Sequence, residues 1–298
     1  MTMRILVIGG NGMLGHTLLG VLGRNFDIRV TLRKTLDTYP HHSLFSTTNT
    51  IEGIKLGSSG DFDLLLSRII AWKPQVIINA AGIVKQRPDA NDAVESIAIN
   101  SLLPHQLAKA ARLVDAKLIH FSTDCIFAGT KGMYREDDLP DATDLYGRSK
   151  LLGEVSGARC LTLRTSLVGR ELARKGESLF EWLLRQKESV RGFPNAIFSG
   201  FTTLEIARIV LKLITEHPNA EGLWHLASQP INKYDLLMLV KQRLSLPIDI
   251  IQDDSIQIDR SLDGSLFQDT FKYNPPDWAT MIDDYFTFLE EERHVVSE

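Results

Sequence analysis

Short apolar runs alternate along the chain with longer amphipathic segments. Most of the runs are apolar at consecutive positions, as is typical of strands buried on both faces of a sheet. They occupy residues 4–10, 28–33, 75–82, 117–123 and 160–166. Between them, helical spacing of apolar residues is found at Met13–Leu22, Phe62–Trp72, Asp92–Leu113 and Tyr146–Val155. This alternation predicts a parallel sheet with helices on both faces and right-handed crossovers.

The pattern changes after residue 166. Segments 170–200 and 229–285 are richer in aromatic residues, proline and mixed polar residues. Residues 222–228 are expected to form another strand, and Asp235–Leu244 and Trp278–Glu291 to form helices. We therefore expect an α/β fold with a doubly wound parallel sheet in residues 1–168. A smaller lobe would occupy residues 169–298, with part of its chain returning to the sheet.

Length, charge and cysteine content narrow the class of protein. The 298 residues suffice for one large domain or two modest ones, and the net charge of −4 argues against a nucleic-acid partner. No apolar run approaches the roughly 20 residues that span a bilayer. Cys125 and Cys160 lie in apolar, strand-like stretches, outside any metal-ligand spacing, and are expected to be reduced. Because the first strand begins at once, we expect no signal peptide and a cytoplasmic location.

A glycine-rich turn follows the first predicted strand in the stretch RILVIGGNGMLG, residues 4–15. Two dinucleotide-binding spacings fit it, one starting at Gly10 and one at Gly9, and both continue through Gly12 and Gly15. Such glycines make the tight turn, admit the pyrophosphate to the backbone and let the helix pack close to the sheet. A glycine turn without a ligand is the alternative, but the strand before it and the helix after it favour a dinucleotide.

The end of the second predicted strand bears on the choice of cofactor. NAD sites usually place an acid there for the ribose 2′-hydroxyl, whereas this strand ends in Leu32-Arg33-Lys34. Two cations suit a 2′-phosphate. The sequence therefore favours NADPH, with NADH as the alternative if Arg33 and Lys34 are simply solvated.

Tyr146 and Lys150 in YGRSK fall on one helix face, four residues apart. A lysine cation is expected to lower the pKa of the tyrosine, which could then give a proton to a carbonyl while hydride reaches its carbon. Lys150 could also hold the nicotinamide ribose. Thr123, at the carboxyl end of its predicted strand, is the candidate that orients the carbonyl. An ordinary surface pair of Tyr146 and Lys150 is the alternative.

Taken together, these motifs resemble the extended short-chain dehydrogenase/reductases and, more narrowly, the dTDP-4-dehydrorhamnose reductase family. The resemblance is nearly full length. It rests on GGNGMLG (9–15), INAAG (78–82), HFSTDCIF (120–127), YGRSKLLGE (146–154), RTSLVG (164–169), FTTLEIA (201–207) and PPDW (275–278). It implies a Rossmann domain with a C-terminal sugar-nucleotide lobe, and hydride transfer to a 4-keto-6-deoxysugar nucleotide in polysaccharide-precursor synthesis.

The resemblance also assigns roles to individual residues. Thr123, Tyr146 and Lys150 would be catalytic. The pyrophosphate would be lined by Gly9, Gly12, Met13 and Leu14, and the nicotinamide ribose by Ala80, Ala81 and Gly82.

Departures from the family pattern fall in substrate-facing regions. Cys125 replaces the usual tyrosine after Ser-Thr-Asp, and Lys85 lies in an altered stretch. The chemistry is therefore expected to be retained and the substrate changed. The candidate substrate contacts are Lys85, Thr123, Cys125, Phe127, Arg164 and Arg191. Solvated residues or local ion pairs are the alternative for the cations among them.

Two other functions stay open at this point. One is a sugar-nucleotide epimerase or dehydratase that uses NAD⁺ catalytically, although dehydratases usually carry Glu where this chain has Cys125. The other is a regulatory subunit like the methionine adenosyltransferase beta subunit, which also resembles this family. A homodimer stays open as well.

Overall fold

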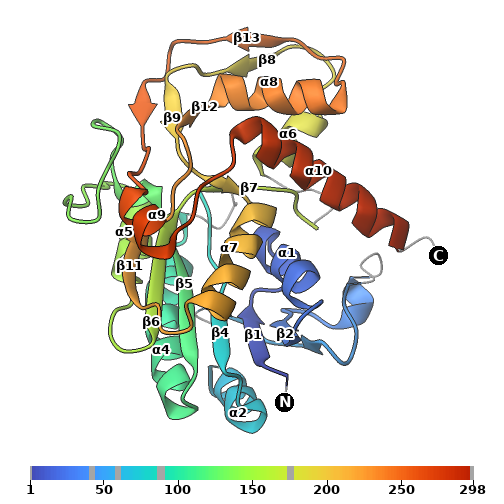
Figure 1. Cartoon of the computed structure of the whole chain (residues 1–298), viewed down its shortest axis with the longest axis vertical. Coiled ribbons are helices and arrows are strands. Elements are labelled where there is room, and N and C mark those ends of the chain that lie inside the picture. The colour runs from blue at the N-terminus through green and yellow to red at the C-terminus, as the bar shows by residue number, and fades with distance from the viewer. Residues whose placement is uncertain (1, 40–43, 58–61, 86–90, 173–177, 296–298) are drawn as a thin grey trace.

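The computed structural model describes residues 2–39, 44–57, 62–85, 91–172 and 178–295. Within them, a seven-stranded parallel sheet has the order β11-β6-β5-β4-β1-β2-β3 (Figure 1). Its strands are β1 (Arg4–Ile8), β2 (Asp27–Thr31), β3 (Thr50–Ile51), β4 (Val76–Asn79), β5 (Lys117–Thr123), β6 (Cys160–Thr165) and β11 (Gly222–His225). The order reverses between β1 and β4, which makes the topological switch point of a Rossmann-type sheet. The doubly wound parallel fold expected from the sequence is confirmed.

Both faces of the sheet are buried, as the continuous apolar runs predicted. In β5 all seven residues are buried. Ile119 points into the core on one face, and its neighbour Leu118 points into the core on the other. This alternation follows from the two-residue period of a strand, and it leaves the strand ends as the places for polar chemistry.

Helices cover each face of the sheet. One core includes residues of α1 (Met13–Leu22), α7 (Thr203–Glu216) and α10 (Trp278–Val295), and the other includes residues of α2 (Phe62–Trp72) and α4 (Leu103–Leu113). α1 and α2 have the bounds that the periodicity predicts. None of the helices in the described part of the chain is long and apolar enough to cross a membrane.

The helix expected at Asp92–Leu113 is irregular. It consists of α3 (Ala93–Ser96), a π-helical segment η3 (Ile97–Leu102) and then α4. Asp92 caps its start by accepting hydrogen bonds from the backbone N–H groups of Val94 and Glu95. The π-helical segment lies beside α5 (Leu145–Leu152), the helix that carries the predicted catalytic pair.

α5 is shorter than predicted. It ends at Leu152 instead of Val155, and the next residue, Gly153, packs against the π-helical segment. A Cβ atom at Gly153 would lie 1.8 Å from the carbonyl oxygen of Asn100. The glycine therefore fixes how closely α5 approaches the neighbouring helix.

The rest of the chain beyond β6 forms three helices and several short strands; α8, β8 and β13 lie at the top of Figure 1 and α9 at its left. The helices are α6 (Leu179–Leu184), α8 (Lys233–Leu244) and α9 (Ser265–Phe271). The short strands are β7 (Leu167–Val168), β8 (Val190–Gly192), β9 (Ala196–Phe198), β10 (Phe201–Thr202), β12 (Ile231–Asn232), β13 (Ile250–Gln252) and β14 (Ile258–Asp259). Single 3₁₀ turns occur at η1 (Leu36–Thr38) and η4 (Asp124–Ile126).

The chain after β6 also contributes to the large sheet. α7 packs on α1, and β11 pairs in parallel with β6. α8 and α10 agree with the two predicted helices apart from their ends, whereas α6, α7 and α9 were not predicted. The division into residues 1–168 and 169–298 stays a prediction.

Candidate functional site

The loops that follow β1, β4 and β5 come together at the carboxyl edge of the sheet. They carry the glycine turn, the segment Ala80–Gly82 and Thr123. Because β1 and β4 flank the switch point, the crevice between their loops is where an open α/β sheet binds its ligand.

Each glycine of the turn satisfies a separate constraint. Gly9 has a φ angle of +89°, which side-chain-bearing residues rarely adopt. A Cβ at Gly15 would lie 2.1 Å from the Gly9 carbonyl oxygen, and one at Gly10 would lie 2.4 Å from the Cβ of Val30 in β2. Gly12 precedes α1 in an extended conformation and donates its N–H to the Gly9 oxygen at 3.1 Å. The tight turn therefore belongs to Gly9, while Gly10 and Gly15 permit close packing.

The start of α1 suits a bound anion. Met13 and Leu14 are its first residues, and none of the described residues in its first turn is acidic. The free N–H groups and the dipole at this end favour a negative charge such as a pyrophosphate. Arg33 and Lys34 follow β2, the neighbour of β1, and both are exposed. Their position is compatible with a 2′-phosphate, and that role stays a prediction.

The segment Ala80–Gly82 packs directly against the glycine turn. A Cβ at Gly9 would lie 3.1 Å from the backbone of Ala81, and one at Gly12 would lie 4.0 Å from the Ala80 carbonyl oxygen. The backbone N–H of Ala81 donates to the Asn79 side-chain oxygen at 3.2 Å. The two loops predicted to hold the cofactor thus form one packed unit.

Asn100 connects this unit to the catalytic helix. Its side-chain oxygen accepts from the Ile83 N–H at 2.9 Å, and its amide nitrogen lies 3.1 Å from the Ile83 carbonyl oxygen. The same nitrogen donates to the Ser149 hydroxyl at 3.2 Å. Asn100 lies in the π-helical segment, and such segments often occur at functional sites. It fixes α5 relative to the loop after β4.

Lys150 projects from α5 into the protein interior. Its ammonium group donates to the carbonyl oxygen of Phe121 in β5 at 2.5 Å. Burial lowers the pKa of Lys150 to about 8, and the nearby Glu154 carboxylate acts in the opposite direction. At neutral pH most of the lysine is therefore still cationic.

Thr123 and Tyr146 lie close together. The Thr123 hydroxyl donates to Asp124 Oδ1 at 3.1 Å and accepts from the Cys125 N–H at 3.1 Å. Burial raises the pKa of Tyr146 well above its usual value, and the neighbouring Cys125 and Asp124 raise it further. The hydrogen bond with Thr123 acts in the opposite direction.

The sequence-based expectation of a lowered tyrosine pKa is therefore wrong for the protein without a bound cofactor. The physical reason is that Tyr146 is desolvated by burial, while the Lys150 ammonium donates to Phe121 instead. A raised pKa keeps the phenol protonated at neutral pH, which is the state that a proton donor needs.

Lys85 and Cys125 both lie next to Tyr146. The Lys85 ammonium pairs with Asp144, the residue that caps α5, at 2.7 Å, and it lies 5.7 Å from the centre of the Tyr146 ring. Burial raises the pKa of the Cys125 thiol to about 12, so that the thiol is neutral. Both candidates therefore lie beside the predicted proton donor, and their contact with a substrate stays a prediction.

The buried guanidinium group of Arg164 is hydrogen-bonded to other residues of the chain. Its guanidinium makes two hydrogen bonds of 2.8 Å to the Glu154 carboxylate and another of 3.2 Å to Nε2 of His225. It also lies over the ring of Phe127, 5.7 Å from the ring centre. These contacts favour a structural role for Arg164 over the substrate contact that was expected.

Phe127 and Arg191 also have partners within the chain. Phe127 is fully buried and stacks on Tyr134, with ring centres 4.2 Å apart. Arg191 is exposed in β8 and pairs with Asp253 at 3.0 Å. Their contacts favour core packing for Phe127 and a surface ion pair for Arg191.

Two residues at the site were overlooked in the sequence. Asp144 caps α5 by accepting the Gly147 N–H at 2.9 Å, and the sequence signal was an Asp directly before a helical run. His120 is fully buried in β5, beside Asn79, and no sequence pattern marks it. No cluster of metal ligands occurs among the residues that the structure describes.

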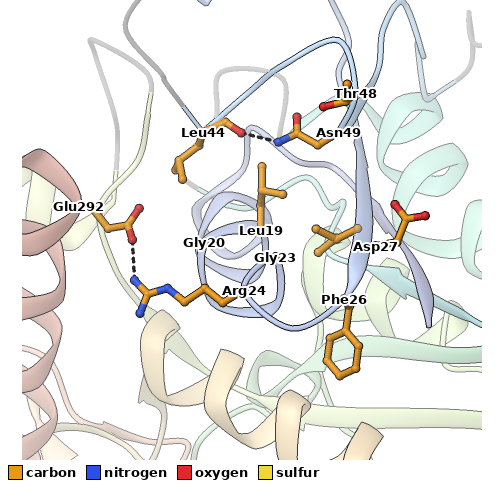
Figure 2. A pocket seen from close by; sticks show the side chains of 11 residues that line it. Leu19, Gly20, Gly23, Arg24, Phe26, Asp27, Leu44, Thr48, Asn49 and Glu292 are labelled. Atoms are coloured by element: carbon orange, nitrogen blue, oxygen red, sulfur yellow. Dashed lines mark hydrogen bonds and ion pairs between the residues drawn. The ribbon is translucent and has the colours of Figure 1, made fainter. Parts of the chain in front are cut away.

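A separate hollow of about 480 Å³ lies at the other end of α1. Leu19, Gly23 and Asp27 contribute to its wall, together with the ion pair of Arg24 with Glu292 at 2.8 Å (Figure 2). It opens near the amino end of β2, whereas the glycine turn precedes α1 at the opposite edge. None of the predicted site residues lines this hollow.

Comparisons with known proteins agree with this architecture. Methionine adenosyltransferase 2 subunit beta from Xenopus laevis is 28% identical over 59% of this chain, but the match spans just 56% of that protein. dTDP-4-dehydrorhamnose reductase from Aggregatibacter actinomycetemcomitans is 26% identical over 80% of this chain and 78% of its own length. The crystal structure of dTDP-4-dehydrorhamnose reductase from Bacillus anthracis in complex with NADP superposes with a TM-score of 0.78 at 20% identity, covering 96% of this chain and 99% of that one. The family model of the RmlD substrate binding domain matches residues 3–288, and the chain therefore belongs to that family.

Proposed function

We propose that this protein uses NADPH to reduce the 4-keto group of a nucleotide-linked 4-keto-6-deoxysugar. The observation that carries the proposal is that Thr123, Tyr146 and Lys150 gather near the carboxyl end of β5, on the same edge of the sheet as the glycine turn that follows β1. Membership of the family and the relatives named dTDP-4-dehydrorhamnose reductase support it.

The residues present fit a dinucleotide. The start of α1 would bind the pyrophosphate, Ala80–Gly82 would lie along the nicotinamide ribose, and Arg33 with Lys34 would contact a 2′-phosphate. When bound, NADPH supplies the hydride. The close packing of Gly15 on Gly9 and of Gly9 on Ala81 leaves no room for a side chain at either glycine.

Proton transfer would fall to Tyr146. Its phenol is protonated at neutral pH and can donate to the sugar O4 as negative charge develops there. The Thr123 hydroxyl would donate a hydrogen bond to the same oxygen and orient the carbonyl. Lys150, one helical turn away, would hold the nicotinamide ribose, because its ammonium is not among the groups that shift the pKa of Tyr146.

Substrate choice would be set beside Tyr146. Cys125 leaves more room than the tyrosine found in the rhamnose reductases, and Lys85 could exchange its partner Asp144 for an anionic group of the nucleotide. Arg164 and Phe127 are not included in this proposal, because their contacts lie within the protein. A cytoplasmic location and a homodimer stay predictions.

The proposal is tested by following cofactor oxidation at 340 nm. NADPH and NADH would be offered in parallel, with dTDP- and UDP-linked 4-keto-6-deoxysugars made in situ by dehydratases. We expect rapid oxidation with one sugar and a preference for NADPH. A protein that binds NADPH but oxidises it with none of these sugars would contradict the proposal.

A regulatory subunit is the second candidate, because relatives named methionine adenosyltransferase 2 subunit beta match this chain at 28% identity. Under that function the protein would form a stoichiometric complex with a partner enzyme. Co-purification from its native host together with an absence of sugar reduction would favour it over the reductase.

A further inference from the structure

His120 is a fully buried residue in the middle of β5, three residues before Thr123. In the parallel register of the sheet it lies directly opposite Asn79, the last residue of β4. The two side chains are hydrogen-bonded, with 3.1 Å between His120 Nδ1 and Asn79 Nδ2. The reductase chemistry described above gives neither side chain a role.

The surrounding hydrogen bonds determine which ring nitrogen carries the proton. Asn79 uses its side-chain oxygen to accept the N–H of Ala81 at 3.2 Å, so the amide nitrogen must face His120. An amide nitrogen is a donor, and His120 Nδ1 must therefore be the acceptor. The proton of the neutral ring is then on Nε2, which has no hydrogen-bond partner among the described residues.

A buried N–H without a partner destabilises the fold, so a site kept for packing alone would favour an apolar side chain. What the imidazole offers here, and an apolar residue could not, is the acceptor at Nδ1. The chain therefore retains a polar residue whose satisfied atom faces Asn79.

The groups around the ring keep that acceptor available. Burial, the Lys150 ammonium of α5 and His105 of α4 all hold the pKa of His120 well below its usual value. On its two flanking strands, the cross-strand neighbours Asn79 and Thr162 are uncharged. Because a second cation beside Lys150 is unfavourable, the ring stays neutral and Nδ1 keeps its lone pair.

Asn79 connects this ring to the cofactor site. The Ala81 backbone that it holds lies 3.1 Å from the position of a Cβ atom on Gly9, in direct contact with the glycine turn. We propose that His120 is a positioning residue whose Nδ1 atom orients the Asn79 amide, so that Asn79 holds Ala81 against the glycine turn where the nicotinamide ribose binds. The inference rests on the proposed dinucleotide site and adds the group that fixes its nicotinamide side.

Two substitutions separate this role from packing. In His120→Asn the side-chain oxygen can occupy the place of Nδ1, whereas His120→Gln puts its polar atoms near the place of Nε2 and better preserves side-chain volume. The dissociation constant of NADPH would be measured on the full chain by fluorescence, with the unfolding temperature as the control.

We expect His120→Asn to bind NADPH within about twofold of wild type and His120→Gln to bind about tenfold more weakly, the effect of losing about one hydrogen bond. If the sugar substrate is known, the KM for NADPH should rise in His120→Gln while the KM for the sugar stays unchanged. A packing role predicts the reverse order, because Asn leaves the larger cavity.

The inference would be overturned if Gln restored binding and Asn did not, if both variants matched wild type, or if both lost affinity equally. These outcomes are independent of turnover. A failure to reduce any sugar would contradict the reductase proposal. The role of His120 would still be tested by comparing the NADPH affinities of the two variants.

Discussion

The residues predicted to hold the cofactor and the residues predicted to contact the substrate differ in the interactions that fix their positions. Among the predicted cofactor residues, backbone packs closely against backbone, with Gly15 against Gly9 and Gly9 against Ala81. Two of the cations that were predicted to contact substrate instead have acidic partners within the protein, Glu154 for Arg164 and Asp253 for Arg191.

The difference explains which residues a sequence can identify. A backbone conformation that only glycine adopts easily requires a glycine at that position, and the glycine can be recognised in the sequence. The sequence does not show in the same way whether an arginine can bind a ligand, because this depends on whether an acidic residue already pairs with it. For Arg191 that partner is 62 residues away.

The two arginines offer the largest expected contrast. Arg164→Met would leave the buried Glu154 carboxylate without its cation, and we expect the free energy of unfolding to fall by about 3–5 kcal/mol. The matched variant Arg191→Met removes an exposed pair and should cost at most about 1 kcal/mol. Urea denaturation of both variants measures the contrast. Equal losses would mean that burial does not distinguish the two pairs.

Tyr146→Phe separates proton transfer to the substrate from binding of the cofactor. The variant removes the proposed proton donor and leaves the glycine turn intact, so turnover should fall about 10²-fold or more. The NADPH dissociation constant should stay within about twofold of wild type, because the hydroxyl is assigned to proton transfer and not to affinity for the cofactor. Turnover near the wild-type rate would remove Tyr146 from the mechanism.

His225, the hydrogen-bond partner of Arg164, makes the free energy of unfolding depend on pH. Burial and the Arg164 cation lower the pKa of His225 to about 4. Between pH 6.5 and 4, His225 is protonated in the unfolded chain but stays neutral in the folded protein. The free energy of unfolding therefore falls as pH falls from 6.5 towards 4.

The expected loss from His225 is about 2 kcal/mol between pH 6.5 and 5. Urea denaturation at both pH values measures it. The variant His225→Gln cannot titrate at this position and should show a smaller loss, although His120 still contributes in the same direction. An unchanged pH dependence in the variant would show that His225 does not titrate in this way.

The smallest expected effect concerns Arg33 and Lys34. Their joint replacement by alanine should weaken NADPH binding by about tenfold and NADH binding by less than about twofold, because NADH has no 2′-phosphate. Parallel titrations with both cofactors measure the difference. An equal loss for both cofactors would indicate that the two residues do not contact the 2′-phosphate.

The sheet and its first two helices could be predicted because their signals are local. The spacing of apolar residues marks both ends of α1 and α2. α7 was overlooked although Thr202 and Glu205 carry the Ser/Thr-x-x-Glu signal of a helix start, and Thr202 does accept the Glu205 N–H at 3.3 Å. The π-helical segment at Asn100 could not be predicted, because its irregular turn depends on contacts with residues distant in the sequence.

In the candidate site, too, the features with a local sequence signal could be predicted and those that depend on distant residues could not. The i, i+4 pairing of Tyr146 and Lys150 placed both residues on α5, and the end of a strand located Thr123. The direction of the Tyr146 pKa shift could not be predicted, because it depends on burial and on where the Lys150 ammonium points. His120 was overlooked because its role depends on a cross-strand neighbour, Asn79, 41 residues earlier in the chain.

The most direct test of the central claim is to trace the transferred hydrogen. NADPH carrying deuterium at C4 of the nicotinamide, on each face in turn, would be consumed with the sugar nucleotide that supports oxidation, and the product examined by mass spectrometry and NMR. We predict that one of the two labels appears at C4 of the sugar, with one deuterium for each NADPH oxidised. A product without deuterium at that carbon, from both labels, would contradict hydride transfer to the sugar.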